Sequence, residues 1–231
     1  MVTLLTYPAA LGQPSVSPFC VKAMHMLNLA GVPWEREDTS DPRKMPYGKL
    51  PVLRVDGNLI ADSDEIRAYL ADQGKDLDAH LSPRDQSVAR AFTRMAEEHL
   101  YFQLLHDRWV DPKNWTETRA ANFSTVPAMM RSLVANSVRK HILKGLHFKG
   151  LARLSPQERL DRADQDLRAI LAQLDGAPFL FGDRPCSADI SVAAMLGGLA
   201  STPHPTPLQA RVAQDPALVS YVDRVTTACA G

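Results

Sequence analysis

The residues best placed for chemistry are Ser17, Pro18, Phe19 and Cys20, which stand in a row. Ser before Pro is typical of a helix start, with Ser at the N-cap and Pro in the first turn. The free backbone N–H groups of such an end bind anions and favour a thiolate over a thiol. A serine hydroxyl there can donate a hydrogen bond to a bound sulfur anion. The row therefore indicates either a site for a sulfur anion or plain helix capping by Ser17.

Cys20 falls on the apolar face of the same predicted helix, together with Ala23, Met24 and Leu27. In that position it is either a small buried hydrophobe or a reactive thiol. The chain has three cysteines, far apart in sequence, and this odd number predicts neither a disulfide framework nor a C-x-x-C pair. Such cysteine use is typical of a reducing compartment. The first 18 residues have no basic segment before their short apolar run, so we expect a cytoplasmic protein without a secretory signal.

Two further segments carry polar groups that a ligand can use. Leu50-Pro51 precedes a predicted strand, and a cis bond there would expose the peptide group of Leu50. Only about 5–6% of X–Pro bonds in folded proteins are cis, so the residues alone favour trans. Asp62-Ser63 stands at another predicted helix start. This pair is either a solvated Asp beside a capping Ser, or a site for the ammonium and carboxylate of an amino acid.

The elements that position these residues follow from the patterning of residues 1–80. Strands are predicted at 2–7, 34–39, 50–55 and 58–61, the last two joined by the strong hairpin signal Asp56-Gly57. One helix runs from Pro18 to a stop at Gly31, and a second is capped by Ser63. Residues 41–49 are expected to be loop or irregular helix. The order β-α-β, then β-β-α, predicts a parallel strand pair with antiparallel neighbours.

The rest of the chain is predicted to be helical, after a linker at 74–81. A long helical segment starts at Ser82-Pro83 and reaches Trp109, and apolar residues recur at helical spacing from 130 to 146. The run Ser155-Pro156-Gln157-Glu158 is a capping box with Pro at the first helical position. Residues 188–199 form an apolar, buried helix, and 217–228 a last one. The sequence thus predicts an α/β domain followed by an all-α domain.

Composition excludes several classes of protein. The 231 residues carry 26 Lys+Arg against 26 Asp+Glu, with 45% hydrophobic residues, which is typical of a globular domain and not of a disordered, fibrous or nucleic-acid-coating chain. No apolar run approaches the ~20 residues of a membrane span, and no His or Cys cluster has metal spacing. Residues 131–153 hold six Lys or Arg and no Asp or Glu. This basic helix is either a solvated face or a contact for an anionic membrane or acidic partner.

Taken together, the three segments and their order resemble the glutathione S-transferase family, and most closely its metaxin-like and failed-axon-connections-like subgroup. The resemblance rests on SPFCVKAMHMLNLAGVPWE, GKLPVLRVDGNLIADSDEI and FLFGDRPCSADISV, and it is thinnest between residues 120 and 154. It implies a thioredoxin-like, glutathione-binding α/β domain over 1–78 and an all-helical domain over 84–231. It also implies a cytoplasmic, homodimeric detoxification enzyme that conjugates glutathione, as co-substrate, to a small electrophile.

The resemblance assigns a role to each candidate residue. Ser17 falls where the family contacts the glutathione sulfur, with Tyr7 and Cys20 as alternatives. Pro51 is then the cis-proline, the backbone of Leu50 pairs with the cysteinyl part, and Asp62 and Ser63 hold the γ-glutamyl end. The remaining implied contacts with glutathione are made by Phe19 and Lys49.

The second domain departs from the family pattern at one helix start. The family places Ser or Thr three residues before a buried Asp, whereas this chain has Cys186 before Asp189. Because cysteine is a poor acceptor, Ser187 caps instead or the helix start is weaker. The electrophile pocket is expected against the first long helix of this domain, where Tyr101 and Trp109 lie, with His106 and Trp115 as further candidates.

Two other functions compete with conjugation. The metaxin-like resemblance implies a non-catalytic adaptor that acts in protein assembly. A glutathione-dependent thiol-disulfide oxidoreductase is the other, with Cys20 as its single thiol and glutathione resolving the mixed disulfide.

Overall fold

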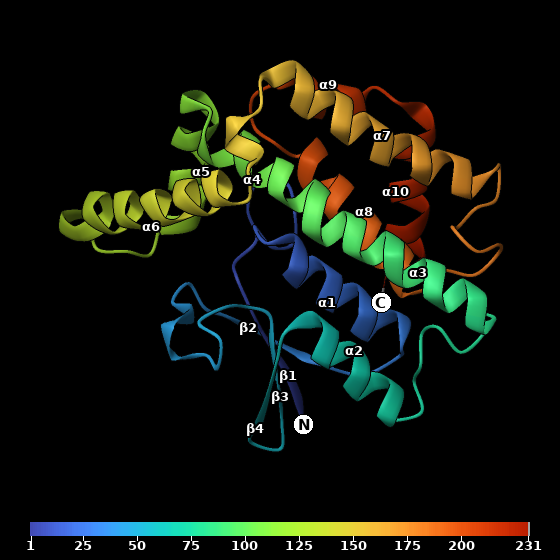
Figure 1. Ribbon diagram of the computed structural model, residues 1–231. Coiled ribbons are helices and arrows are strands. Elements are labelled where there is room, and N and C mark those ends of the chain that lie inside the picture. The colour runs from blue at the N-terminus through green and yellow to red at the C-terminus, as the bar shows by residue number, and fades with distance from the viewer. Residues whose placement is uncertain (231) are drawn as a thin grey trace.

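The computed structural model describes residues 1–230 and stacks a small sheet domain beneath a larger set of helices (Figure 1). The sheet has the order β2-β1-β3-β4. Its strands are β1 (Val2–Thr6), β2 (Glu35–Asp38), β3 (Val52–Val55) and β4 (Asn58–Ala61). β1 pairs parallel with β2 and antiparallel with β3, and β3 pairs antiparallel with β4. The predicted parallel pair and the hairpin are both confirmed.

Helix α1 (Pro18–Leu29) is the crossover between the parallel strands, and it lies between the sheet and the helical domain. Its residues Ala23 and Leu27 share one core with Leu4 and Leu53 of the sheet and with Ile190 of the second domain. Since α1 contributes to both sides of this core, the position of its first turn is fixed by the whole molecule.

Helix α2 (Ser63–Asp72) begins one residue earlier than predicted, because Asp62 and not Ser63 is its N-cap. The carboxylate of Asp62 accepts a hydrogen bond from the Asp64 N–H at 2.9 Å. Ser63 is the first helical residue, and its hydroxyl instead accepts from the ammonium of Lys22 at 3.2 Å. The prediction that Ser63 caps the helix is therefore wrong, because its hydroxyl is hydrogen-bonded to the buried ammonium of Lys22 on α1.

The long segment that starts the second domain is helical throughout, with one irregular turn. Ser82 caps α3 (Pro83–Met95), a π turn follows at η2 (Ala96–Leu100), and α4 (Tyr101–Trp109) continues from it. Residues 112–123, which the sequence patterns left unassigned, form α5 (Pro112–Phe123), capped by Asp111. The remaining elements are η1 (Pro42–Lys44), α6 (Ala128–Phe148), η3 (Leu151–Arg153), α7 (Pro156–Leu174), α8 (Ser187–Ala200), α9 (Pro207–Ala213) and α10 (Pro216–Ala228).

Helices α5 and α6 form an arm that extends away from the other helices (Figure 1). The arm has its own small core, in which Trp109 and Trp115 lie 5.2 Å apart between ring centroids. Arg139 anchors α6 to this core: its guanidinium lies 4.8 Å over the Trp115 ring and its Nε donates to the Trp109 carbonyl at 2.9 Å. The outer side of the predicted basic helix also exposes large apolar residues, with Met129 98% and Leu133 71% exposed. None of the helices within residues 1–230 is both long and apolar enough to cross a membrane.

The start of α8 is secured by Asp189. Its carboxylate, fully buried, accepts from the N–H groups of Cys186 and Leu180 at 2.9 Å each and from the hydroxyl of Tyr221 at 2.9 Å. Ser187 does not take over the cap, because its hydroxyl donates to Asp78 in the linker at 2.7 Å. The substitution of cysteine at the cap therefore leaves this helix start well bonded.

Candidate active site

The three segments singled out in the sequence converge on the first turns of α1. Cys20 packs in one small apolar cluster with Leu50, the residue before the proline, and with Tyr7 at the end of β1. Two residues further along α1, the ammonium of Lys22 donates a hydrogen bond to Ser63 at the start of α2. Residues that are far apart in sequence therefore surround a single helix N-terminus, where backbone N–H groups favour an anion.

Ser17 stands at this N-terminus and is half-buried. It is the N-cap residue of α1 by its extended backbone, yet its side chain makes no capping hydrogen bond. Its own N–H donates to the Ser15 hydroxyl at 3.3 Å, and its side chain borders a cavity. The interpretation of Ser17 as a plain helix cap is therefore wrong. Its hydroxyl makes no capping bond and is available to a ligand in the cavity.

Tyr7 and Cys20, the two alternatives to Ser17, differ in access. Tyr7 borders the same cavity as Ser17. Burial raises the pKa of the Tyr7 phenol well above its usual range, so it stays protonated and acts only as a neutral donor. Cys20 is fully buried, and this burial raises the pKa of its thiol more than the neighbouring polar groups of Thr6 and Tyr7 lower it. A buried thiol with a raised pKa is a poor nucleophile.

The Leu50–Pro51 peptide bond is cis, as the resemblance implied, although the residues alone favoured trans. Leu50 is buried against Cys20, whereas Lys49 before it is exposed. Phe19 is half-buried and packs edge-on against Tyr101, with ring centroids 4.7 Å apart. The contacts of Phe19, Lys49 and Leu50 with glutathione remain predictions.

Asp62 and Ser63 are positioned differently from each other. Asp62 is exposed, with a positive φ of 84°, and its carboxylate is engaged in capping α2. Ser63 is buried and held by Lys22, whose ammonium also contacts Glu97 of the second domain at 2.5 Å. Of the two residues that the resemblance assigns to the γ-glutamyl end, Ser63 is therefore linked to the helical domain through the buried Lys22.

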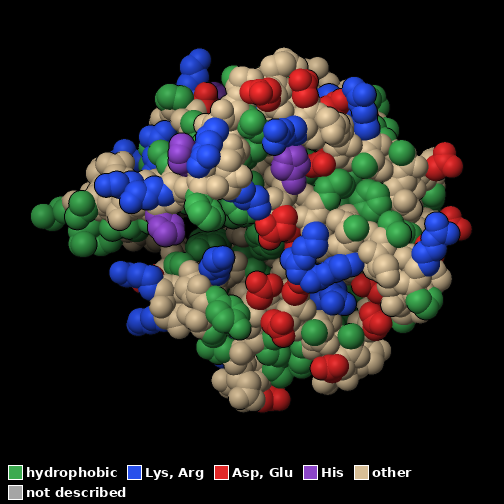
Figure 2. Space-filling view, viewed as in Figure 1, with side chains coloured by type: hydrophobic (Ala, Val, Ile, Leu, Met, Phe, Trp, Pro, Cys, Tyr) green, Lys and Arg blue, Asp and Glu red, His purple; other side chains and the backbone are tan. Residues whose placement is uncertain are grey.

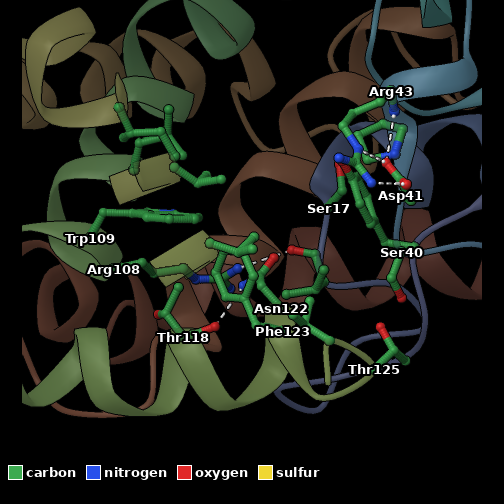
Figure 3. A pocket seen from close by; sticks show the side chains of 18 of the residues that line it. Ser17, Ser40, Asp41, Arg43, Arg108, Trp109, Thr118, Asn122, Phe123 and Thr125 are labelled. Carbon is green, nitrogen blue, oxygen red and sulfur yellow. Dashed lines mark hydrogen bonds and ion pairs between the residues drawn. The ribbon is translucent and has the colours of Figure 1, made fainter. Parts of the chain in front are cut away.

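A cavity of about 590 Å³ opens beside Ser17 and extends under the α5–α6 arm (Figure 3). In this view Ser17, Ser40, Asp41 and Arg43 lie on one side, and Arg108, Trp109 and Thr118 lie on the other. The arm's contribution is largely apolar, from residues such as Val134, Val138 and Ile142. Figure 2 shows the matching recess between the arm and the sheet domain, with apolar atoms at its back. The cavity suits a small, mostly apolar molecule that meets a group bound at Ser17.

Of the pocket residues expected from the sequence, Tyr101 and Trp109 border this cavity. Burial raises the pKa of the Tyr101 phenol to about 12, so Tyr101 is protonated at neutral pH. His106 and Trp115 do not border it: His106 faces Asp107 at 3.9 Å, and Trp115 packs against Trp109 in the core of the arm.

The sequence analysis missed several polar residues of the cavity, and two of them are buried. Arg108 is 4% exposed and Thr118 1% exposed, yet both border the cavity. Thr118 lies on α5, which could have been recognised from its Asp111-Pro112 start. Arg108 stands between the aromatic candidates of α4 and carries no motif of its own, so only packing identifies it. Among residues 1–230 no group of His, Cys, Asp and Glu is arranged to hold a metal ion.

Fold and site together define a two-domain protein in which a helix N-terminus of the α/β domain borders a largely apolar cavity that the helical domain covers. Residues 18–114 match the model of the glutathione S-transferase N-terminal domain, and residues 163–225 that of the C-terminal domain. The chain is 33% identical over 236 residues to the isoprene-epoxide–glutathione S-transferase of Rhodococcus sp. (strain AD45), which covers 97% of this chain and 98% of that one. The chain belongs to the glutathione S-transferase family.

Other similarities place the chain within that family. It is 28% identical to metaxin-1 of Mus musculus over 84% of this chain, and 28% identical to failed axon connections of Drosophila melanogaster over 94%. It spans only 63% and 55% of the length of these two relatives. The fold matches that of glutathione transferase GSTFuA3 from Phanerochaete chrysosporium, with a TM-score of 0.66 at 17% identity over 100% and 97% of the two chains.

Proposed function

We propose that this protein conjugates glutathione to a small electrophile and that Ser17 stabilises the glutathione thiolate. The observation that carries the proposal is the serine hydroxyl at the N-terminus of α1, free of a capping bond and bordering a cavity. The relative with 33% identity, named for glutathione transfer to isoprene epoxide, supports it across nearly the whole chain.

The chemistry requires the peptide thiol to lose its proton before it attacks. A hydroxyl donor and the N-terminal N–H groups of α1 both favour the anionic sulfur, so more thiolate is present at neutral pH. The backbone of Leu50 and the pair Asp62-Ser63 would fix the two ends of the peptide. Holding the sulfur at the mouth of an apolar cavity then orients it toward a bound electrophile.

Ser17→Ala tests this assignment. Removing the donor is expected to lower kcat by about a hundredfold, the usual effect of deleting one donor to a reacting anion, with little change in glutathione affinity. Turnover with 4-nitrobenzyl chloride and calorimetric titration of glutathione measure the two effects. Ser40→Ala removes another hydroxyl from the same cavity and serves as the matched control. If Ser17→Ala is as active as wild type, Ser17 does not stabilise the thiolate, and Tyr7 or Cys20 becomes the candidate for that role.

The similarity to metaxin-1 favours a second function, that of a non-catalytic adaptor. An adaptor needs neither a thiolate site nor an electrophile. Calorimetry with glutathione separates the two functions, because absence of binding at millimolar peptide supports the adaptor and removes the transferase.

The oxidoreductase alternative depends on Cys20, whose thiol is fully buried. Loss of glutathione-dependent reductase activity in Cys20→Ser would support it, and unchanged activity would eliminate it.

The proposed transferase retains two expectations from the sequence analysis, a cytoplasmic location and a homodimer. Sedimentation of the purified protein tests the latter.

A further inference from the structure

The outer face of α6 exposes apolar side chains from one end of the helix to the other. Met129 and Leu133 near its start and Phe148 at its end have 98%, 71% and 91% of their surface exposed. Of the 21 residues of this helix, only Ala135 and Leu146 are buried. Since a folded chain seldom exposes several large apolar side chains on one helix, the outer face of α6 indicates a contact with something outside this chain.

The charges of α6 are all of one sign. No Asp or Glu stands between residues 118 and 157, a stretch that contains seven Lys or Arg. Lys149, just after the helix, contacts Glu98 at 2.7 Å, whereas the exposed Lys140 and Lys144 have no ionic partner within residues 1–230. Two unpaired ammonium groups, one turn apart, favour an anionic surface as the partner.

The apolar and the basic side chains lie on the same side of the helix. At about 100° of rotation per residue, Met129, Leu133, Lys140, Lys144 and Phe148 fall within an arc of about 100°. The valine and isoleucine side chains by which α6 lines the large cavity lie on the neighbouring arc. Figure 2 shows apolar side chains at the free end of the arm and Lys, Arg and His side chains along it. The outer face is therefore a separate surface from the cavity.

The extent of this face suits a flat partner. Met129 and Phe148 are about 28 Å apart along the helix axis, with both lysines between them. The arm extends away from the other helices (Figure 1), which makes its outer side accessible. An acidic peptide segment would pair with the lysines and leave the apolar ends bare. A bilayer surface offers phosphate groups and an apolar layer along the whole helix at once.

We propose that the outer face of α6 docks this protein on the surface of a bilayer that contains anionic lipids. Met129, Leu133 and Phe148 enter the boundary between headgroups and acyl chains, and the ammonium groups of Lys140 and Lys144 lie beside lipid phosphates. The helix lies along the surface, so the contact is peripheral. None of these five side chains lines the large cavity, so the inference is independent of the proposed transferase activity.

Cosedimentation with vesicles tests the basic half of the face. The full chain should bind vesicles of three parts phosphatidylcholine to one part phosphatidylserine, and should bind pure phosphatidylcholine far more weakly. Binding should also weaken as salt is added. Lys140→Gln with Lys144→Gln is expected to lower the partition coefficient about thirtyfold. Lys75→Gln with Arg184→Gln removes two charges from exposed loops elsewhere, and this matched control should bind as wild type does.

A second pair of variants tests the apolar half. Leu133→Ser with Phe148→Ser changes only exposed side chains, so the fold should be kept, as circular dichroism can verify. Vesicle binding is expected to fall at least about tenfold. Leu59→Ser with Val219→Ser removes two exposed apolar side chains from β4 and α10, and this control should bind as wild type does.

Three results would overturn the proposal. If both variants of α6 bind the vesicles as well as wild type, the contact lies elsewhere on the molecule. If wild type binds polyglutamate but not the phosphatidylserine vesicles, the partner is an acidic protein segment. If wild type binds no vesicles and Leu133→Ser with Phe148→Ser turns a dimer into a monomer in sedimentation, a second copy of this chain covers the face.

Discussion

His25 is a histidine that the fold keeps neutral. It lies on α1 with 9% of its surface exposed. Its Nδ1 has no hydrogen-bond partner within residues 1–230. Burial lowers the pKa of His25 from 6.5 to about 4, because the imidazolium cannot be solvated there.

The lowered pKa of His25 predicts a loss of stability in acid. Between pH 6.5 and pH 4 the unfolded chain binds a proton at this residue and the folded chain does not, so the free energy of unfolding falls as the pH falls. From pH 7 to pH 5 the contribution is about 2 kcal/mol. Urea denaturation of wild type and His25→Leu at both pH values measures it. The variant should lose about that much less than wild type, whereas His80→Leu, at an exposed histidine, should match wild type. Parallel losses in all three proteins would contradict the assignment.

The sequence alone could not decide the roles of the key site residues, for physical reasons. The sequence pattern Ser-Pro is the same whether the serine hydroxyl caps the helix or faces a cavity. Only the structure shows that the Ser17 side chain makes no capping hydrogen bond. Arg108 and Thr118 border the cavity because of how the helices pack, which no spacing rule contains.

Single elements followed the sequence more closely. The Ser155 capping box, the hairpin at Asp56-Gly57 and the Ser82 cap were predicted from local rules, and the structure has all three. Local rules failed at α2, where Lys22, 41 residues away, engages Ser63. At α5 it was the hydrophobic spacing that failed, because its apolar residues face the core of the arm without the regular spacing of a longer helix, whereas the Asp111-Pro112 start was a usable signal.

Mutations in the two capping boxes of the second domain are expected to lower the free energy of unfolding by very different amounts. The Ser155 box is exposed, so Ser155→Ala is expected to cost about 1 kcal/mol. The Asp189 box is buried and also bonds Leu180 and Tyr221, so Asp189→Ala leaves three buried donors unpaired. Since each such donor costs about 1–3 kcal/mol, the loss should exceed about 3 kcal/mol. Urea denaturation at pH 7 ranks the variants, and similar losses would show that burial does not set the value of the motif.

At the scale of the molecule, the proposed glutathione site does not depend on overall charge. Residues 1–80 carry 8 Lys+Arg against 11 Asp+Glu, so the domain expected to bind an anionic peptide is itself slightly acidic. Attraction must come from groups within a few ångströms, chiefly the N–H groups of α1, because solvent and salt screen longer distances. The placement of α1 against both domains is therefore what makes the site.

Lys22 is a buried residue of α1 that links this helix to the second domain. Its ammonium contacts Glu97 of η2 at 2.5 Å, and both side chains are at most 4% exposed. The same carboxylate oxygen accepts from Ser191 of α8 at 3.1 Å. Four elements, α1, α2, η2 and α8, thus meet at this buried ion pair, which extends to Asp64 beside Lys22 and to Arg94 beside Glu97.

Removing one member of this pair should therefore destabilise the whole molecule. Lys22→Met leaves the buried Glu97 with the partly exposed Arg94, 3.3 Å away, as its remaining ionic partner among residues 1–230, so the expected cost is about 3 kcal/mol. It also removes the bond that holds the Ser63 hydroxyl, so glutathione affinity should fall as well. The double variant Lys22→Met with Glu97→Met removes both charges and should recover much of that stability, but not the affinity. Arg90→Met, in the partly exposed pair with Asp64, is the control and should cost at most about 1 kcal/mol. Urea denaturation and calorimetry measure the two effects. Additive losses in the double variant would mean that the two residues act independently and that this ion pair does not couple the domains.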